Sequence, residues 1–484
     1  MNFQIIFYII GYILRIEGLL LLFPSITGMI YREKEAIAYL ICAIATALIG
    51  ILMTIKKPKN QVFYAKEGFT SVALCWIFLS LFGCAPFILS GDIPRFTDAF
   101  FEMVSGFTTT GASILTDVEA MSHATLLWRS FSHWIGGMGI LVFALTILPL
   151  SGGSTMHLMK AESPGPQVGK ILPKIRDTSK VLYIIYVVMT LAEMLILICL
   201  KMPIFDAVTI SLGTAGTGGF AVRASGCADY TAIQQYVIAI FMILFGVNFN
   251  VYFLAVRKQF KQALRCEEAR WYLGIIGAST LLIMLNTLKI FATAEEAFRH
   301  ALFQVGSIIT TTGYATFDFS QYYPVFSNVI LVLLMFCGAC AGSTGGGMKV
   351  SRIITWAKSA ILEIIQTIHP RAVRKVRLEG KVVDSATMRS IHGYLTAYFF
   401  IFSGALLLIS LDNFDFTSSF TAVVTTINNI GPGLNKVGPY GGFSEFSDLS
   451  KWVFSLTMLT GRLELFPMLA LFYPQTWTRS FKLR

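Results

Sequence analysis

Charge is scarce in this sequence. Asp, Glu, Lys and Arg make up 13% of its 484 residues, whereas soluble globular domains usually carry about 25%. Hydrophobic residues account for 55% of the chain, and apolar runs recur from one end to the other. This composition excludes a set of soluble domains and predicts an integral membrane protein whose helices face the lipid bilayer.

The sequence also lacks the residue clusters of a disulfide framework, a metal centre or an enzyme active site. Six of its eight cysteines lie in or beside apolar runs, where a thiol behaves as a small hydrophobic side chain. Cys337 and Cys340 have CxxC spacing, but no second pair or histidine cluster accompanies them, so a metal or redox role is not expected. No nucleophile–base set stands out either, and we expect neither an enzyme nor an organic cofactor in this chain.

Acidic residues are fewer than basic ones, 27 against 38, and the net charge is +11. The basic residues form no continuous stripe of the kind that binds nucleic acid. They lie in short segments between apolar runs, at residues 56–66, 160–180, 257–270, 349–389 and 479–484. This is the positive-inside pattern of a multi-pass membrane protein. It predicts that these segments and both termini are cytoplasmic, and it excludes a nucleic-acid partner.

Ten apolar runs approach the length of about 20 residues that a helix needs to cross the hydrocarbon layer. They are residues 4–29, 36–55, 68–90, 125–149, 180–202, 233–256, 271–292, 325–343, 390–411 and 451–473. Between several of them lie shorter apolar segments that end in Gly and Thr. Non-helical backbone at membrane depth is tolerated only where protein or a watery cavity surrounds it, so these segments are predicted to be re-entrant hairpins.

The hairpin segments are copies of one another. Residues 98–111 (DAFFEMVSGFTTTG) align without a gap with residues 300–313 (HALFQVGSIITTTG) and 418–431 (SSFTAVVTTINNIG), and residues 206–218 (DAVTISLGTAGTG) fit after one deletion. A tight turn explains one such segment. Four copies, each after a short apolar helix, favour a repeated pore-lining unit.

Each copy ends in residues whose backbone carbonyls can bind a dehydrated cation. Rings of backbone carbonyls replace the water shell of K⁺, and glycine allows the backbone angles that turn those carbonyls toward an axis. The C-terminal end of a short pore helix carries partial negative charge that favours a cation there. We therefore expect K⁺ to bind and pass at the filter carbonyls of Thr109, Thr110, Gly111, Gly216, Thr217, Gly218, Thr311, Thr312, Gly313, Asn429, Ile430 and Gly431, with the four terminal glycines at the narrowest level.

These segments resemble the filter loops of the Trk/Ktr/HKT superfamily of K⁺ transporters. The resemblance rests on Thr-Thr-Thr-Gly111, Thr-Gly218-Gly-Phe, Thr-Thr-Thr-Gly313-Tyr and Asn-Asn-Ile-Gly431-Pro-Gly, and it covers essentially the whole chain. The extra apolar pair at residues 4–55 is similar to the leading domain of one branch of that superfamily. Glycine at all four filter positions goes with K⁺ preference in the superfamily, and serine in the first goes with Na⁺ permeation.

A second glycine-rich segment, residues 337–349 (CGACAGSTGGGMK), interrupts the apolar run of the third repeat. Such a glycine density does not sustain a straight helix. It is not a nucleotide-binding loop, because GxxxxGK[ST] is absent. The residues alone allow either a simple kink or a flexible loop under the filter. The resemblance implies a gate there, formed by Gly338, Gly342, Ser343, Thr344, Gly345, Gly346, Gly347 and Lys349.

Arg462 lies inside the last apolar run. An arginine at membrane depth is costly unless it faces a cavity or a partner, although it could also reach the cytoplasmic surface along its own stem. About ten mostly apolar residues follow it, so we expect it near mid-depth. The resemblance places an arginine beside the gate, and we assign Arg462 to that gate.

The predicted fold is an all-α integral membrane protein with a leading two-helix domain and four helix–re-entrant pore hairpin–helix repeats around one pseudo-fourfold pore. The leading domain is residues 1–60. The repeats are residues 61–155, 156–262, 263–370 (with the gate loop) and 371–484.

The predicted function is K⁺ uptake across the cytoplasmic (inner) membrane of a bacterium through this channel-like subunit. A symporter coupled to H⁺ or Na⁺ and a less selective Na⁺/K⁺ pathway stay open as alternatives. The resemblance further implies a homodimer and a cytoplasmic ring of TrkA-type nucleotide-binding regulator subunits that docks on residues 160–180 and 349–389.

Overall fold

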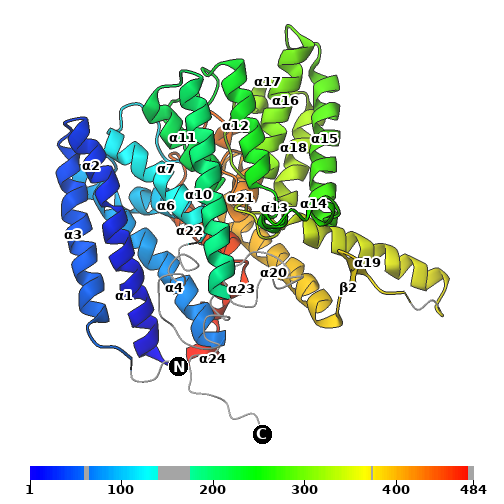
Figure 1. The fold of residues 1–484 in the computed structure, drawn as a ribbon, viewed down its shortest axis with the longest axis horizontal. Coiled ribbons are helices and arrows are strands. Elements are labelled where there is room, and N and C mark those ends of the chain that lie inside the picture. The colour runs from blue at the N-terminus through cyan, green and yellow to red at the C-terminus, as the bar shows by residue number, and fades with distance from the viewer. Residues whose placement is uncertain (59–64, 140–174, 372–373, 478–484) are drawn as a thin grey trace.

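The computed structural model describes residues 1–58, 65–139, 175–371 and 374–477. These residues form α-helices, two short 3₁₀ helices and a single hairpin, β1 (Arg377–Leu378) with β2 (Lys381–Val382). The all-α prediction is confirmed. Figure 1 shows most helices running in one common direction.

The leading pair consists of α1 (Phe3–Leu20) continued by α2 (Leu22–Ile30), and of α3 (Glu35–Thr54). Glycines let the two helices touch along their length: a Cβ at Gly18 would lie 2.7 Å from the Ala47 nitrogen. Small residues promote such close packing of membrane helices. The pair also reaches the neighbouring unit, because the Glu33 carboxylate accepts hydrogen bonds from the His123 and Ala124 amides at the start of α7.

Four units of one design follow. Each has a long outer helix, a short helix and a second long or broken helix. They are α4 (Ala65–Gly83) with α5 (Ala85–Ser90), α6 (Phe96–Phe107) and α7 (His123–Gly137); α10 (Ile175–Cys199), α11 (Ile204–Gly216) and α12 (Ala232–Phe245); α15 (Glu267–Thr287), α16 (Ala294–Ile309) and α18 (Val325–Cys337); α20 (Ser385–Ile409), α21 (Phe416–Ile427) and α22 (Asp448–Arg462).

Local sequence explains where the short helices begin. Thr293 accepts a hydrogen bond from the Glu296 amide at the start of α16, and Asp415 accepts one from the Ser418 amide at the start of α21. Such caps satisfy amides that have no partner inside the helix. The hydrogen bonds from Ser418 also hold the pKa of Asp415 below its ordinary value, so this carboxylate remains negatively charged.

Six of the ten predicted spans are long, apolar helices, and a seventh is the pair α12 and α13 (Phe249–Val256), which bends by 91°. The uninterrupted helices predicted over 233–256 and 451–473 are wrong, whereas the break that the glycine-rich segment 337–349 predicted in the run 325–343 is present. Their chains break after Phe245, Cys337 and Arg462. Glycine or polar residues occupy each break, and they release the backbone from helical hydrogen bonding. Residues 140–149 of another predicted span lie outside the described residues.

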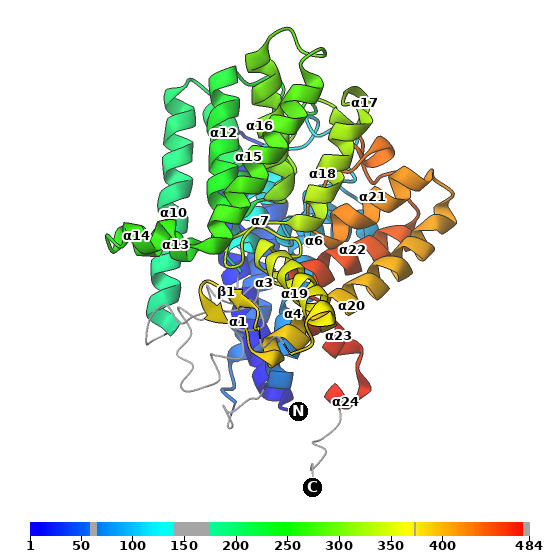
Figure 2. The same ribbon diagram turned by 90° about the vertical axis from the view of Figure 1, so that its right-hand side faces the viewer.

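The remaining described elements lie at the two ends of the units. They are α14 (Phe260–Leu264), α17 (Phe319–Tyr322), α19 (Val350–Ile368), η1 (Ser410–Asp412), η2 (Asn435–Val437), α23 (Phe466–Phe472) and α24 (Pro474–Trp477). The start of α1 and helix α24 lie at the same end of the molecule (Figure 1). Helix α19 projects away from the bundle toward the viewer in Figure 2.

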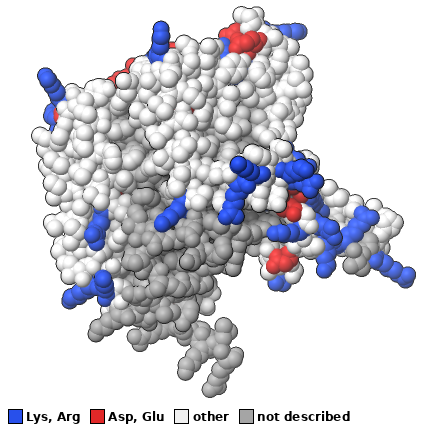
Figure 3. Space-filling view, viewed as in Figure 1, with Lys and Arg blue, Asp and Glu red and all other residues white. Residues whose placement is uncertain are grey.

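Charge and apolar surface divide as a membrane requires. Figure 3 shows Lys and Arg concentrated over the lower half of this face and along α19, with an acidic patch at its upper edge. Large apolar side chains are exposed along the outer helices, including Ile37, Leu52, Leu195, Leu285 and Leu407. Such a surface is stable against lipid tails and unstable in water.

Candidate functional site

The four short helices end in the same backbone turn. In each, one amide donates to the carbonyl three residues earlier and the next amide donates to the carbonyl five residues earlier, at N···O distances of 2.8–3.4 Å. The first set of donors is Thr109, Thr217, Thr311 and Asn429, and the second is Thr110, Gly218, Thr312 and Ile430. The first set also shares a left-handed φ of 55–59°. The four segments are therefore equivalent in structure.

The residues that follow these turns form a closed ring in chain order. A Cβ on Gly111 would lie 2.7 Å from the Gly219 nitrogen, and one on Gly219 would lie 2.8 Å from the Gly313 carbonyl carbon. A Cβ on Gly313 would meet Ile430 and Pro432, and one on Gly431 would lie 2.7 Å from the Thr110 oxygen. We call Gly111, Gly219, Gly313 and Gly431 the glycine ring. Side chains are excluded from this ring because its members contact one another through backbone atoms.

The ring corrects the prediction for the second segment. Gly218 is equivalent to Thr110, not to Gly111, and Gly219 takes the place at the ring. Residues 206–219 then align with residues 98–111 without any deletion. Two adjacent glycines made both registers acceptable by sequence, and only the hydrogen bonds decide between them. Gly216 accordingly lies one residue before the turn, at the position of Thr108.

The other predicted filter residues are brought together at this ring. Thr109, Thr110, Thr311, Thr312, Asn429 and Ile430 are all fully buried. Gly111, Gly313 and Gly431 have φ values of 78°, 88° and 95°, a region that side-chain-bearing residues rarely adopt. Gly219 lies outside that region. Its side chain is excluded by contact rather than by φ.

Loop 338–349 lies directly against the glycine-ring segments. The Gly346 amide donates to Thr311 Oγ1 at 2.6 Å, and a Cβ on Gly345 would lie 2.9 Å from the Thr310 oxygen. Gly338, Gly342 and Gly347 have φ values of 69–76°, so the loop is a folded turn. Lys349 is buried, and its ammonium group donates to the Gly345 carbonyl within the same loop.

Polar contacts hold the middle of the loop, at residues 342–344. The Ser343 hydroxyl donates to the Cys340 oxygen at 2.6 Å, and the Thr344 hydroxyl donates to the Phe245 oxygen at 3.3 Å. The Gly342 oxygen accepts a bond from the Phe249 amide at 3.0 Å. All eight predicted loop residues therefore lie in one structure next to the ring.

Arg462 lies at the C-terminal end of α22 and links three units below the ring. Its Nη1 donates to the Thr344 oxygen at 2.9 Å, and its Nη2 donates to the oxygens of Gly136 and Gly137 at 2.5 and 2.8 Å. Gly136 and Gly137 end α7, whereas Thr344 belongs to loop 338–349. The half-buried guanidinium of Arg462 thus donates three hydrogen bonds to main-chain carbonyls, a geometry that its planar set of N–H groups suits.

The chain has known relatives along its whole length. A profile of the TrkH family, described as a cation transport protein, matches residues 32–479. The chain belongs to the TrkH family.

Individual relatives agree with that assignment. The TrkH-family chain is 36% identical over 489 residues to the Trk system potassium uptake protein TrkH of Salmonella typhimurium, covering 99% of this chain and 100% of the relative. It is 31% identical over 481 residues to the Trk system potassium uptake protein TrkG of Escherichia coli, covering 98% of both. The crystal structure of the potassium transporter TrkH from Vibrio parahaemolyticus superposes with a TM-score of 0.88 at 32% identity, covering 99% of this chain and 100% of that one.

Two features of this TrkH-family site escaped the sequence analysis. Glu268 on α15 accepts hydrogen bonds from the Ala341 amide, inside loop 338–349, and from the Ser351 amide, just after the loop, at 2.7 and 3.1 Å. Arg352 on α19 forms an ion pair with Glu464, which follows α22. These contacts join residues 73 to 112 positions apart in the chain. Local sequence offers no signal for them beyond the presence of a charge inside or beside an apolar run.

The carboxylates above the ring are largely paired. Asp98 lies 2.6 Å from the Lys451 ammonium group, and Asp206 lies 2.9 Å from the Arg223 guanidinium group. Glu102, fully buried, accepts bonds from Arg129 and from the Ser113 hydroxyl. Glu102 and Asp206 thereby hold the chain that follows Gly111 and Gly219, whereas Asp98 links α6 to α22.

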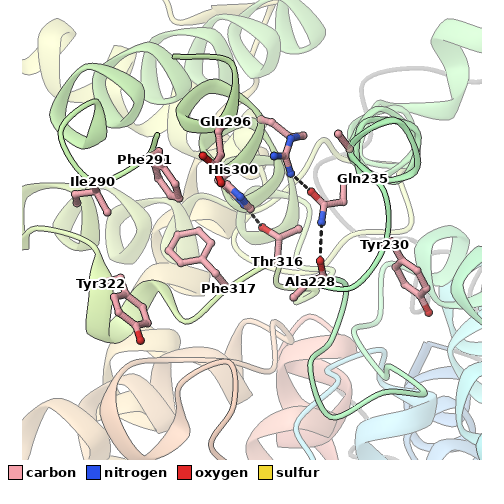
Figure 4. Close-up of a pocket in the computed structure, with 12 residues that line it drawn as sticks. Ala228, Tyr230, Gln235, Ile290, Phe291, Glu296, His300, Thr316, Phe317 and Tyr322 are labelled. Atoms are coloured by element: carbon pink, nitrogen blue, oxygen red, sulfur yellow. Dashed lines mark hydrogen bonds between the residues drawn. The ribbon is translucent and has the colours of Figure 1, made fainter. Parts of the chain in front are cut away.

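One open groove of about 550 Å³ lies between the second and third units at the acidic end (Figure 4). Arg299 donates to Gln235, which in turn donates to the Ala228 oxygen, and His300 bonds to Thr316. The polar groups of Arg299, Gln235, His300 and Thr316 therefore have partners in the groove wall. Among the described residues, no cluster of three or more His, Cys, Asp or Glu could hold a metal ion.

Proposed function

We propose that this chain takes up K⁺ across the cytoplasmic membrane of a bacterium as the ion-conducting subunit of a Trk system. The glycine ring is the observation that carries the proposal. Four equivalent turns bring the four segments into backbone contact with one another, at atoms that include the Thr110, Thr312 and Ile430 oxygens. Rings of such carbonyls bind K⁺ in place of its water shell. Relatives that are potassium uptake proteins over their whole length support K⁺ as the transported ion.

The proposed filter consists of residues 109–111, 217–219, 311–313 and 429–431. It uses main-chain oxygens, which explains why the four side-chain sequences differ. The proposed domains are the leading pair and the four units, with the acidic end outward and both termini cytoplasmic. The concentration of basic residues at one end supports that orientation.

The proposed gate is loop 338–349 together with Arg462. The loop lies directly on the ring segments, and Arg462 ties it to α7. A fixed positive charge beneath a cation filter opposes the passage of K⁺. A TrkA-type nucleotide-binding regulator acting on the projecting helix α19 would reach the loop directly, since α19 begins at Val350, immediately after the last loop residue. A homodimer with one pore in each protomer completes the proposed assembly.

The decisive experiment measures ⁸⁶Rb⁺ and ²²Na⁺ uptake into liposomes that contain the purified full-length protein, with and without a regulator. We expect Rb⁺ uptake that exceeds Na⁺ uptake, and we expect Gly111→Ser to bring the two rates together. Absence of Rb⁺ uptake by correctly folded protein in every condition would refute the pore. Equal uptake of Rb⁺ and Na⁺ by the unmodified protein would refute the selectivity.

The same assay separates the alternative of a coupled symporter. A pore passes Rb⁺ down its own gradient when no H⁺ or Na⁺ gradient is imposed. A symporter requires the second gradient for net accumulation. The four units of one common design favour the pore, because coupled transporters more often use inverted repeats with a midplane site.

A further inference from the structure

The second segment of the glycine ring lacks side chains that the others possess. In the first segment Thr108 and Thr110 join their hydroxyls at 2.8 Å, and in the third Thr310 and Thr312 do so at 2.7 Å. In the second segment the two equivalent positions are Gly216 and Gly218. Without replacement, this quarter of the ring would have less support than its neighbours.

His133 of α7 occupies the vacant space. A Cβ on Gly218 would lie less than 3.0 Å from three atoms of the His133 ring, and its three nearest neighbours all belong to that ring. Gly218 does not have a left-handed φ, so its backbone would accept a side chain. The imidazole is therefore what requires glycine at position 218.

The imidazole also forms hydrogen bonds on both of its sides. Nδ1 lies 2.8 Å from the Gly106 oxygen, in the first short helix, and Nε2 lies 3.3 Å from the Phe220 nitrogen, directly after the ring residue Gly219. A carbonyl can only accept and an amide N–H can only donate. Both bonds therefore exist together only in a neutral imidazole with its hydrogen on Nδ1.

Helix α7 holds the same segment at a second point. Arg129, one turn before His133, places its guanidinium group 4.0 Å from the centre of the Phe220 ring. The centre of the His133 ring lies 4.3 Å from the centre of the same Phe220 ring. The Glu102 carboxylate holds Arg129 in turn. Both side chains lie on one face of the helix, as an i, i+4 pair must.

From these contacts we infer that His133 is a positioning residue for ion selectivity: its imidazole takes the place of the side chain missing at Gly218 and fixes the carbonyls of Gly218 and Gly219. This inference rests on the proposed function, because selectivity has meaning only in a conducting protein. It predicts that K⁺ preference depends on a residue of the first unit that lines no part of the ring itself.

The test compares Na⁺/Rb⁺ uptake ratios among variants that still conduct Rb⁺. His133→Leu fills a similar volume without hydrogen bonds and should raise the ratio about tenfold, the effect of losing one to two buried hydrogen bonds. His133→Gln retains one donor and one acceptor at similar reach and should stay within about twofold of the unmodified protein. An unchanged ratio in a conducting His133→Leu protein would overturn the inference.

A double-mutant comparison tests the contact itself. Gly218→Ser should abolish selectivity or thermal stability when His133 is present, because the two side chains would overlap. In a His133→Ala background the same serine should have a several-fold smaller effect, since the space is then vacant. Equal effects of Gly218→Ser in both backgrounds would contradict the proposal.

A spectroscopic measurement gives a result that does not depend on transport. The chain has six histidines, and the ¹⁵N signal that disappears in His133→Gln identifies His133 in solid-state NMR spectra of histidine-labelled protein. We expect a neutral ring with its hydrogen on Nδ1. A protonated ring or the opposite tautomer would overturn the assignment. Failure of the proposed function is separate, because it would appear as absent Rb⁺ uptake in the unmodified protein.

Discussion

The glycine ring and loop 338–349 touch one another but are built on opposite principles. The ring is formed by four segments, each of which follows a short helix and has the same pair of backbone hydrogen bonds at the C-terminal end of that helix. The loop exists once, in the third unit, and side chains from distant elements hold it: Arg462 from α22 and Glu268 from α15. Backbone hydrogen bonds within each segment fix the glycine ring, whereas loop 338–349 depends on side chains from other parts of the chain.

Under the proposed function, that difference assigns selection of the ion to the ring and control of its passage to the loop. Substitution in the ring forces backbone atoms apart, because its members already contact one another. Each side-chain hydrogen bond to the loop contributes about 1–3 kcal/mol, so the loss of one shifts an open–closed equilibrium without unfolding the protein. Changes in the ring should therefore alter which ion passes, and changes at the loop should alter how often ions pass.

The largest effect is expected from Gly313→Ala. Its φ of 88° and its contact with Ile430 and Pro432 leave no room for a methyl group. We expect the Rb⁺/Na⁺ uptake ratio to fall by more than about tenfold, corresponding to roughly 1.4 kcal/mol or more of lost discrimination.

Gly404→Ala is the matched control for that change. Gly404 lies in the exposed helix α20 with no atom within 4 Å of an added Cβ. Alanine should stabilise that helix slightly and leave the uptake ratio unchanged. A loss of selectivity in both variants would show that the ring has no special sensitivity.

Arg462→Gln should have the next largest effect. It removes the positive charge and at least one of the three bonds to the carbonyls of Gly136, Gly137 and Thr344. Because charge-assisted bonds contribute about 1.5–3 kcal/mol each, Rb⁺ uptake without regulator should rise by about tenfold or more, with the Rb⁺/Na⁺ ratio unchanged. The exposed Arg270→Gln provides the control, and a fall in uptake by Arg462→Gln would contradict a closing role.

Glu268→Gln should act in the same direction but less strongly. The amide oxygen can still accept from the Ala341 and Ser351 amides, but those two bonds lose the assistance of a negative charge. We expect an increase in unregulated Rb⁺ uptake of about two- to fivefold, equivalent to the weakening of one charge-assisted bond. Glu363→Gln, an exposed position on α19, is the comparison; the hypothesis fails if both variants behave alike.

The smallest effect is expected from Glu445→Gln at the outer surface. Glu445 pairs with Lys436, and both side chains are about half exposed. Exposed ion pairs of this kind contribute about 0–1 kcal/mol, so the Rb⁺ concentration for half-maximal uptake should change by less than about twofold. Any change should disappear at high ionic strength, and a large effect that persists in salt would reveal a cation site at the mouth.

The sequence was sufficient to predict the membrane class, the all-α fold and three of the four ring positions. The apolar runs and the gap-free repeat are each visible within a single segment of the chain. Gly111, Gly313 and Gly431 occupy the last position of three aligned copies and directly follow a threonine or isoleucine. The register of the second segment was wrong because Gly218 and Gly219 are adjacent and equally plausible by residue type.

The remainder of the site depends on contacts between distant residues. Glu268 and Arg352 gain their roles from partners 73 and 112 positions away, and the role of His133 depends on a vacancy in another unit. Helix breaks after Phe245 and Arg462 were also missed, because apolar composition continues across them while hydrogen bonding does not. A sequence pattern indicates the periodicity of one segment, but it does not indicate which distant segment will contact a given side chain.

Construction of the ring from a single chain has a genetic consequence. In an assembly of four identical subunits, one codon change appears in all four quarters of the ring together. Here each quarter is encoded separately, and a point mutation alters one quarter while three keep their original form. Selection can therefore change the quarters independently. The combination of Gly216 and Gly218 with His133 at the second segment is a difference between quarters that a ring of four identical subunits could not have.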